Sequence, residues 1–261
     1  ANSIRIVRNV TGSTYKFNTM SKGGYMTNKS RFEDITVMSD SSKSMGGSAT
    51  YTGGVAAHAT VTATLNNYVA GEYVDDFDQL KTNFDFRQTY AEAIGGALAR
   101  AYDSEIIAQL DASSPTTTVT ASGGLTKAKF LEIAEGLNSN DVDTADRYLV
   151  MSPAALTDLL ADSGVTTAAD GAISNVALST GFIPNFLGFN LIVSNLLSLA
   201  STGVRRCFAF QKNSVGLAVG KEVTASINYV PQKVSHLIAG EFSAGAAVID
   251  ATGVVQINVT E

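Results

Sequence analysis

Alternating apolar and polar residues predict a strand over residues 58–66 of the chain. A period of two is typical of a strand with one apolar face. The stretch before it, residues 39–54, is rich in serine and glycine, and "RFEDITVM" precedes that, so the whole resembles a long ribbon. A two-stranded ribbon is marginally stable alone in water, and we therefore expect a neighbouring surface to cover it. The apolar positions are Ala59, Val61, Ala63 and Leu65, and they alternate with His58, Thr60, Thr62, Thr64 and Asn66.

A four-residue apolar step predicts a long helix after residue 85. Each step overshoots the 3.6-residue turn by about 40°, so the apolar stripe winds around the helix and should touch more than one element. Gly95 and Gly96 each cost on the order of 1 kcal/mol relative to alanine in mid-helix. We interpret them as the place where another backbone crosses closely. The apolar positions are Ile94, Leu98, Tyr102, Ile106 and Leu110.

The second half of the chain mixes helices and strands without a regular βαβ repeat, which indicates the α+β class. The polar stretch 112–124 is interpreted as a subdomain boundary. Thr126 is expected to cap one helix, and Ser152 followed by Pro153 is a start signal for another. Expected strands include "RYLVM", "FNLIVS", "RCFAFQ", "EVTASINYV" and "GVVQINV".

Four aspartates gather near the expected start of the long helix. They could supply general acid chemistry, or they could favour the positive end of the helix dipole. No calcium loop fits, because the required glycine and closing glutamate are absent. We interpret the acids as the polar opening of a structural helix. They are Asp75, Asp76, Asp78 and Asp85.

Other candidate chemistry is weak. The stretch "GLAVGKE" (216–222) has the wrong glycine spacing for a phosphate loop, and Glu222 would repel phosphate, so we interpret it as a turn. His58 and His236 with the single Cys207 do not form a zinc pattern, and Cys207 is expected to be a buried thiol. We expect no catalytic residue, no metal site and no cofactor.

Composition favours a surface that partners cover. Only 16% of residues are charged, and the net charge is −6. Low charge is typical of interface cores. The net charge is negative and Arg205 and Arg206 form the only adjacent basic pair, so the sequence does not favour binding of nucleic acid through its phosphates. The first residues do not resemble a signal peptide. The uncharged run 171–204 is interrupted by Pro184 and by asparagines, which argues against a membrane span.

Several stretches, in this order, resemble the major capsid proteins of tailed bacteriophages, which have the Hong Kong 97-type fold. The first resembles the start of that family's long spine helix, and the second resembles the strand–turn–helix of its axial domain. The others resemble later strands and turns of the family. The stretches are "VDDFDQLKTNFDFRQTYAEAIGGALARAYDSEII", "RYLVMSPAALTDLL", "GFIPNFLGFNLIVSNLL", "CFAFQKNSVGLAVGKEV" and "AGEFSAGAAVIDATGVVQINV".

The resemblance implies an N-terminal arm, a ribbon that lies on the next subunit, a peripheral domain built on the spine helix, and an axial domain. Residues 74–261 carry the likeness, and residues 1–73 match by position rather than by motif. The implied ranges are 1–30 for the arm and first strands, 31–73 for the ribbon, 74–118 with 220–240 for the peripheral domain, and 119–219 with 241–261 for the axial domain.

The function implied by the resemblance is a structural protein, not an enzyme, that self-assembles into the icosahedral shell of a tailed phage around double-stranded DNA. The implied partners are other copies in hexamers and pentamers, portal, scaffolding or decoration proteins, and DNA held without sequence-specific binding. The implied location is the virion, after synthesis in the bacterial cytoplasm, with no membrane contact. Two alternatives remain: the shell of a cellular nanocompartment, and a soluble enzyme that uses Asp75, Asp76 and Asp78.

Overall fold

The computed structural model describes residues 3–20, 58–75, 81, 86–162 and 183–261. Two compact units divide the chain: one comprises Ala1–Tyr15 and Thr62–Glu261, and the other Lys16–Val61. The long stretches 21–57 and 163–182, which include the expected strand "RFEDITVM", lie outside the described residues.

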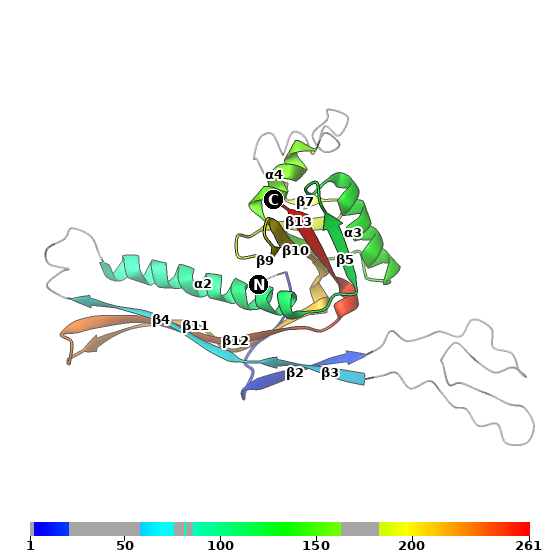
Figure 1. Ribbon diagram of the computed structural model, residues 1–261. Coiled ribbons are helices and arrows are strands. Elements are labelled where there is room, and N and C mark those ends of the chain that lie inside the picture. Colours follow the sequence, from blue (N-terminus) through cyan, green and yellow to red (C-terminus); the bar gives the residue numbers. More distant parts are fainter. Residues whose placement is uncertain (1–2, 21–57, 76–80, 82–85, 163–182) are drawn as a thin grey trace, which may run out of the picture. The chain divides into compact units, whose positions relative to one another are not determined.

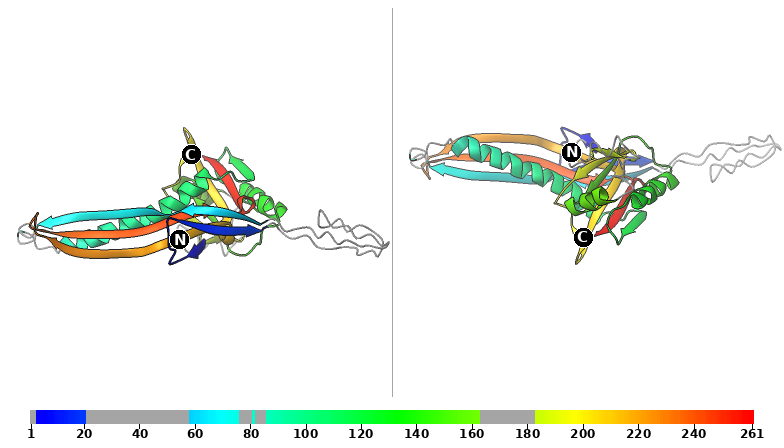
Figure 2. Two further views of the ribbon diagram at one scale, coloured as in Figure 1. Left: turned by 90° about the horizontal axis from the view of Figure 1, so that it is seen from below. Right: turned by 90° about the horizontal axis from the view of Figure 1, so that it is seen from above.

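A four-stranded sheet with one long helix forms the first part of the larger unit (Figure 1). The sheet order is β1-β11-β12-β4, with β1 parallel to β11 and the other pairs antiparallel. Figure 2 shows from two sides that helix α2 runs along this sheet. The elements are β1 (Arg5–Val7), β4 (Asn66–Asp75), α2 (Phe86–Ala112), β11 (Val215–Val230) and β12 (Ser235–Val248).

The predicted apolar stripe of the long helix is confirmed. Four of its five positions are buried, and Tyr102 is half-buried beside Phe242, at 4.8 Å between ring centroids. Phe242 also stacks on Tyr68 of β4, at 4.7 Å. Helix α2 contacts both β12 and β4, so more than one element meets it, as its winding predicts. The buried positions are Ile94, Leu98, Ile106 and Leu110.

The predicted close crossing at the helix glycines is wrong. A Cβ added at Gly95 would have no described atom of another element within 4 Å, and at Gly96 the nearest would be the Arg100 side chain at 3.6 Å. The close approach is instead made by Gly240 of β12, where a Cβ would lie 2.6 Å from Leu98 Cδ1. The strand, not the helix, therefore carries the glycine that lets the two elements meet.

A seven-stranded sheet forms the second part of the larger unit, in the order β5-β13-β10-β6-β8-β7, with β9 paired to β10. Helix α3 packs on β5 and β13, and Phe130 of this helix is fully buried against the rings of Phe186 and Phe189. The strands are β5 (Thr117–Ala121), β6 (Arg147–Met151), β7 (Asn185–Phe186), β8 (Phe189–Val193), β9 (Leu199–Ser201), β10 (Val204–Gln211) and β13 (Val254–Thr260). The helices are α3 (Lys127–Ser139) and α4 (Pro153–Ala161), with 3-10 turns at Lys212–Ser214 and Ala251–Gly253.

The two predicted helix starts have different outcomes. Ser152 Oγ accepts a hydrogen bond from Ala155 N at 3.1 Å, as predicted for α4. Thr126 occupies the capping position of α3, but its side chain makes no capping hydrogen bond. Asp162 Oδ2 instead accepts from Lys127 N at 2.8 Å. The end of α4 therefore caps the start of α3, 35 residues away.

The polar stretch 112–124, interpreted as a subdomain boundary, contains β5, which pairs in parallel with β13 and has Val119 and Ala121 buried. The boundary itself stays a prediction. One expectation about local structure is corrected. The stretch 216–222 is not a turn but part of strand β11, which has irregular register between Val219 and Thr224. A Cβ at Gly220 would lie 3.3 Å from Val10 O, so this glycine serves a close contact between segments.

Strands β2 (Thr14–Met20) and β3 (His58–Thr64) pair as a two-stranded sheet. The predicted alternation of β3 is confirmed for the side chains described: the threonines are exposed, Ala63 is buried and Val61 is half-buried. Strand β4 begins at Asn66, so the four-stranded sheet includes residues that we expected in the ribbon. Strands β11 and β12 extend across the boundaries expected at 219/220 and 240/241.

Candidate functional site

The acid cluster suggested by the sequence is not assembled by the described residues. Asp75 is the last residue of β4 and lies opposite Ser235 of β12. It therefore ends a strand, and the interpretation that it opens the helix is wrong. Asp76, Asp78 and Asp85 lie outside the described residues. As described, α2 begins at Phe86 and has no acid in its first turn.

Cys207 is fully buried in β10, as predicted. Burial disfavours the thiolate and raises the pKa of Cys207 to about 11, although hydrogen bonds with Ser152 act in the opposite direction. His236 lies in β12 with its ring 5.3 Å from Tyr229, and the side chain of His58 lies outside the described part. Among the residues that the structure describes, no group of three histidine, cysteine or acidic side chains could hold a metal ion.

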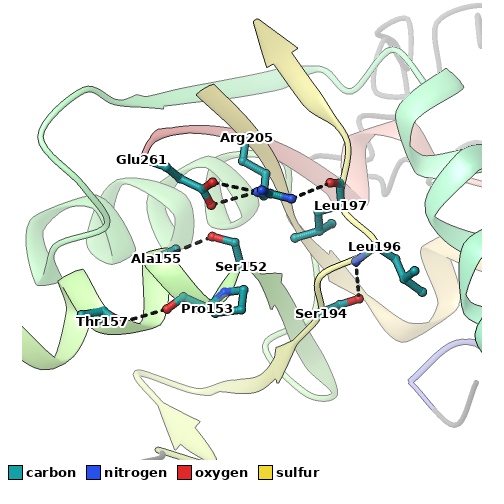
Figure 3. Close-up of polar contacts among 9 residues, drawn as sticks. All are labelled: Ser152, Pro153, Ala155, Thr157, Ser194, Leu196, Leu197, Arg205 and Glu261. Atoms are coloured by element: carbon teal, nitrogen blue, oxygen red, sulfur yellow. Dashed lines mark hydrogen bonds and ion pairs between the residues drawn. The ribbon is translucent and has the colours of Figure 1, made fainter. Parts of the chain in front are cut away.

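A polar cluster ties the end of β13 to β10 and to the start of α4 (Figure 3). Arg205 Nε donates to both carboxylate oxygens of Glu261 at 2.9 Å, and its Nη1 donates to Leu197 O at 3.0 Å. Burial acts to raise the pKa of Glu261, but hydrogen bonds from Ser152 and Arg205 and the charge of Arg205 outweigh it and lower the pKa. A carboxylate held by these donors is suited to fastening strands, not to proton transfer.

Both members of the basic pair are engaged by acids. Arg205 binds Glu261, while Arg206 Nη1 lies 3.8 Å from Asp111 Oδ1 at the end of α2. The Arg206 pair connects the long helix to the seven-stranded sheet. Neither guanidinium is therefore presented as a simple free cation to a phosphate backbone.

A buried acid that the sequence analysis missed lies between α2 and the four-stranded sheet. Glu105 is 8% exposed and accepts a hydrogen bond from the Tyr68 hydroxyl at 2.5 Å. Burial, together with the hydrogen bond and the charge of Glu105, raises the pKa of Tyr68 to about 12. The sequence did indicate this burial, because Glu105 comes three residues after Tyr102 and therefore lies next to the apolar stripe of the helix. The pair fastens the helix to β4.

The outer edge of β11 is the most distinctive exposed feature of the four-stranded sheet. Strand β1 pairs with Gly216–Ala218, and Val10 N donates to Val219 O at 3.0 Å. Beyond Val219, no strand in the described part of the chain pairs with this edge. Residues 221–229 are all exposed. A row of backbone hydrogen-bonding groups is thus available to another strand.

The side chains along this edge are uncharged, and several of them are apolar. Ile227 lies opposite Ile238, which is on the face of the sheet that α2 contacts through Gly240. The exposed apolar residues are Val223 (49%), Ile227 (52%) and Tyr229 (50%). We call residues 223–230 the open edge; the sequence "VTASINYV" contains no charge and no proline.

Charges next to the open edge neutralise one another. Lys221 pairs with Glu241, and Arg8 Nε lies 2.9 Å from Glu222 Oε1. A cavity of about 300 Å³ lies beside them, lined in part by Ile6, Ala99, Tyr102 and Val223. Proteins usually protect edge strands with charges, prolines or covering segments. The open edge has none of these among the described residues, so its chemistry suits a docking surface for another chain.

None of the helices in the described ranges combines the length and the apolar character needed to cross a membrane.

A long helix on a four-stranded sheet, joined to a mixed seven-stranded sheet, defines the Hong Kong 97-type capsid fold. A family model described as "Phage capsid protein" matches residues 1–261. The chain therefore belongs to the phage capsid protein family. It is a structural shell protein and a component of the virion.

Solved structures with the same fold come from several sources. The capsid of cyanophage P-SCSP1u is 17% identical, with a TM-score of 0.74, and the match covers 98% of this chain and 86% of that one. Mycobacterium phage Che8 is 17% identical, with a TM-score of 0.69 and coverage of 95% and 85%. A virus-like particle from Pyrococcus furiosus is 12% identical, with a TM-score of 0.63 and coverage of 98% and 90%. No curated protein matches the sequence.

Proposed function

We propose that the chain is the major capsid protein that self-assembles into the icosahedral shell of a tailed bacteriophage around double-stranded DNA. The observation that carries the proposal is the open edge of β11 in a chain of the phage capsid family. Such an edge favours pairing with another copy, and a closed shell provides every copy with a neighbour.

The two sheets have distinct roles in this proposal. The four-stranded sheet with α2 is the peripheral domain, and the seven-stranded sheet with α3 and α4 is the axial domain. The proposed N-terminal arm and first strands comprise residues 1–30, and the proposed ribbon, residues 31–73, lies on the next subunit. The open edge, with the paired charges next to it, is the surface that receives a segment of a neighbouring copy.

The proposed contents and partners follow from the low charge of the chain. The net charge of −6 does not favour tight binding of packaged DNA, so the shell encloses DNA without sequence-specific contacts. Other copies form hexamers and pentamers, and portal, scaffolding or decoration proteins complete the particle. Synthesis takes place in the bacterial cytoplasm before assembly into the virion.

The first experiment is electron microscopy of the purified native protein, with light scattering on the same sample. Uniform closed shells tens of nanometres across that contain nuclease-sensitive DNA are the expected result. Shells that contain protein cargo and no DNA would favour the cellular nanocompartment. A small oligomer under all assembly conditions would contradict the shell and favour the soluble enzyme.

A matched pair of variants tests the open edge. Ile227→Glu places a charge at a position that is 52% exposed, and Leu131→Glu on α3 places the same charge at a position that is 54% exposed. We expect Ile227→Glu to prevent shell formation, because a buried unpaired carboxylate is strongly unfavourable. We expect both variants to fold. Equal assembly of the two variants would contradict docking at the open edge.

The enzyme alternative has its own test. Replacing Asp76 and Asp78 by asparagine would abolish the activity of a soluble enzyme and leave its oligomeric state unchanged. For a capsid protein, the same replacement should affect folding or assembly only modestly. Particle yield and thermal unfolding of this double variant separate the two functions.

A further inference from the structure

An exposed leucine occupies a turn position that disfavours leucine. Phe186 of β7 pairs directly with Phe189 of β8. The loop between the two strands therefore consists of two residues, Leu187 and Gly188. The φ angles are 48° at Leu187 and 84° at Gly188. Positive φ at both positions is the signature of a type I′ hairpin turn, for which Asn-Gly is the preferred sequence.

The side chain of Leu187 buries little apolar surface inside its own subunit. It is 43% exposed, whereas a leucine in the left-handed region is sterically unfavourable. Asparagine would relieve that strain and would suit the exposure. The sequence thus combines backbone strain with an apolar side chain at the tip of a hairpin, and strain of this kind is concentrated at functional positions.

The base of the hairpin is rigid. Phe186 and Phe189 are 3% and 0% exposed, and both rings meet Phe130 of α3, at 5.0 Å and 6.2 Å between centroids. Leu191 N donates to Pro184 O at 3.0 Å behind the turn. The tip is therefore held in one position, and a pre-positioned side chain loses little entropy when it binds a partner.

The hairpin also lies where another molecule can reach it. Strand β7 is the last strand at one end of the seven-stranded sheet (Figure 1). We propose that Leu187 is an assembly contact that inserts between copies of this chain in the shell. The occupant is a second copy because the chain belongs to a capsid family, whose subunits surround one another; the inference rests on the proposed function.

Leu187→Asn tests the inference because it should change folding and assembly in opposite directions. For the unassembled subunit, we expect the ratio of folded to unfolded molecules to rise about fivefold, since the turn becomes Asn-Gly. For the shell, we expect the protein concentration needed for assembly to rise roughly tenfold or more, since each subunit loses a buried leucine contact. Urea unfolding measures the first and light scattering across a dilution series the second.

Two variants complete the design. Leu187→Met keeps both the strain and the apolar side chain, so it should assemble at nearly the wild-type concentration. Leu131→Asn removes a leucine of similar exposure from α3 and should leave the assembly concentration unchanged. If the wild-type protein forms shells and Leu187→Asn assembles at the same protein concentration, the inference about Leu187 is overturned and the proposed function is not. Lower stability of that variant would overturn the argument from strain, and absence of wild-type shells would overturn the proposed function and the inference with it.

Discussion

Gly240 lies where strand β12 meets helix α2, and its replacement by alanine tests how tightly the two elements pack. A Cβ at this position would lie 2.6 Å from Leu98 Cδ1 and 2.8 Å from Ile94 Cγ2. Ordinary contacts between carbon atoms are about 3.5–4.0 Å. The two helix side chains, which are 3% and 8% exposed, would each have to retreat by roughly 1 Å in a packed core.

We expect Gly240→Ala to lower the free energy of unfolding by about 1–3 kcal/mol, the usual range for overpacking. Alanine loses less backbone entropy than glycine on folding, by roughly 0.5–1 kcal/mol, and this places the expected value in the lower part of the range. Urea unfolding of the unassembled subunit, followed by circular dichroism, measures the change. Gly95→Ala is the matched control and should raise the free energy of unfolding by about 1 kcal/mol, because no described neighbour meets the new methyl group.

A double-mutant cycle separates steric overlap from a general effect on the strand. Leu98→Ala alone should destabilise the subunit by about 2–5 kcal/mol. The combination with Gly240→Ala should destabilise it by less than the sum of the two, because the new methyl group occupies space that the leucine leaves. If the destabilisation of the double variant equals the sum of the two single values to within about 0.5 kcal/mol, the predicted contact is refuted. An unchanged free energy of unfolding for Gly240→Ala would also refute it.

Three further substitutions or measurements test other contacts. Tyr68→Phe removes the hydroxyl that donates to buried Glu105 and should lower the free energy of unfolding by about 1.5–3 kcal/mol, whereas an unchanged unfolding midpoint would contradict this role. Gly245→Ala would place a Cβ 2.0 Å from the backbone oxygen of Thr64; we expect a loss on the order of 3 kcal/mol or more, measured by the same denaturation, because backbone yields less than a side-chain end. Cys207, with its pKa near 11 and full burial, should resist alkylation at pH 8 until urea unfolds the protein, and rapid labelling of the native subunit would contradict its burial.

Local periodicity and local capping were predictable from the sequence. The helix stripe, the alternating strand and the start of α4 at Ser152 depend on residues within a few positions of one another, so short-range pattern determines them. The resemblance to capsid proteins was carried by ordered phrases over residues 74–261, and the family model confirms it over the whole chain.

Features that depend on a distant partner were not predictable. Gly95 and Gly96 suggested a close crossing, but the crossing is made by Gly240, more than 140 positions later. The cap of α3 is supplied by Asp162, which no local pattern around Thr126 indicates. The stretch 216–222 has the glycines of a turn, yet it forms a strand because β12 pairs along it.

The candidate site was hidden for a related reason. An open edge is defined by which strands do not pair with it, and pairing is a property of the sheet. The sequence "VTASINYV" predicts a strand, but only the sheet order shows that its outer side is uncovered in the described residues. Low charge and the marginal stability of the expected ribbon indicated that a partner covers part of the surface, but neither pointed to this edge.

The charges next to the open edge are paired within the subunit. Burying an unpaired charge between subunits is costly, so charges near an interface must be paired within the subunit, as Lys221 is with Glu241 and Arg8 with Glu222. Removing charge from the edge allows another copy to dock, but it also removes the usual protection against irregular edge-to-edge pairing. In the proposed shell, the same residues therefore favour both assembly and aggregation. Productive assembly would then require that a neighbouring copy cover the edge before an unfolded or misaligned strand does.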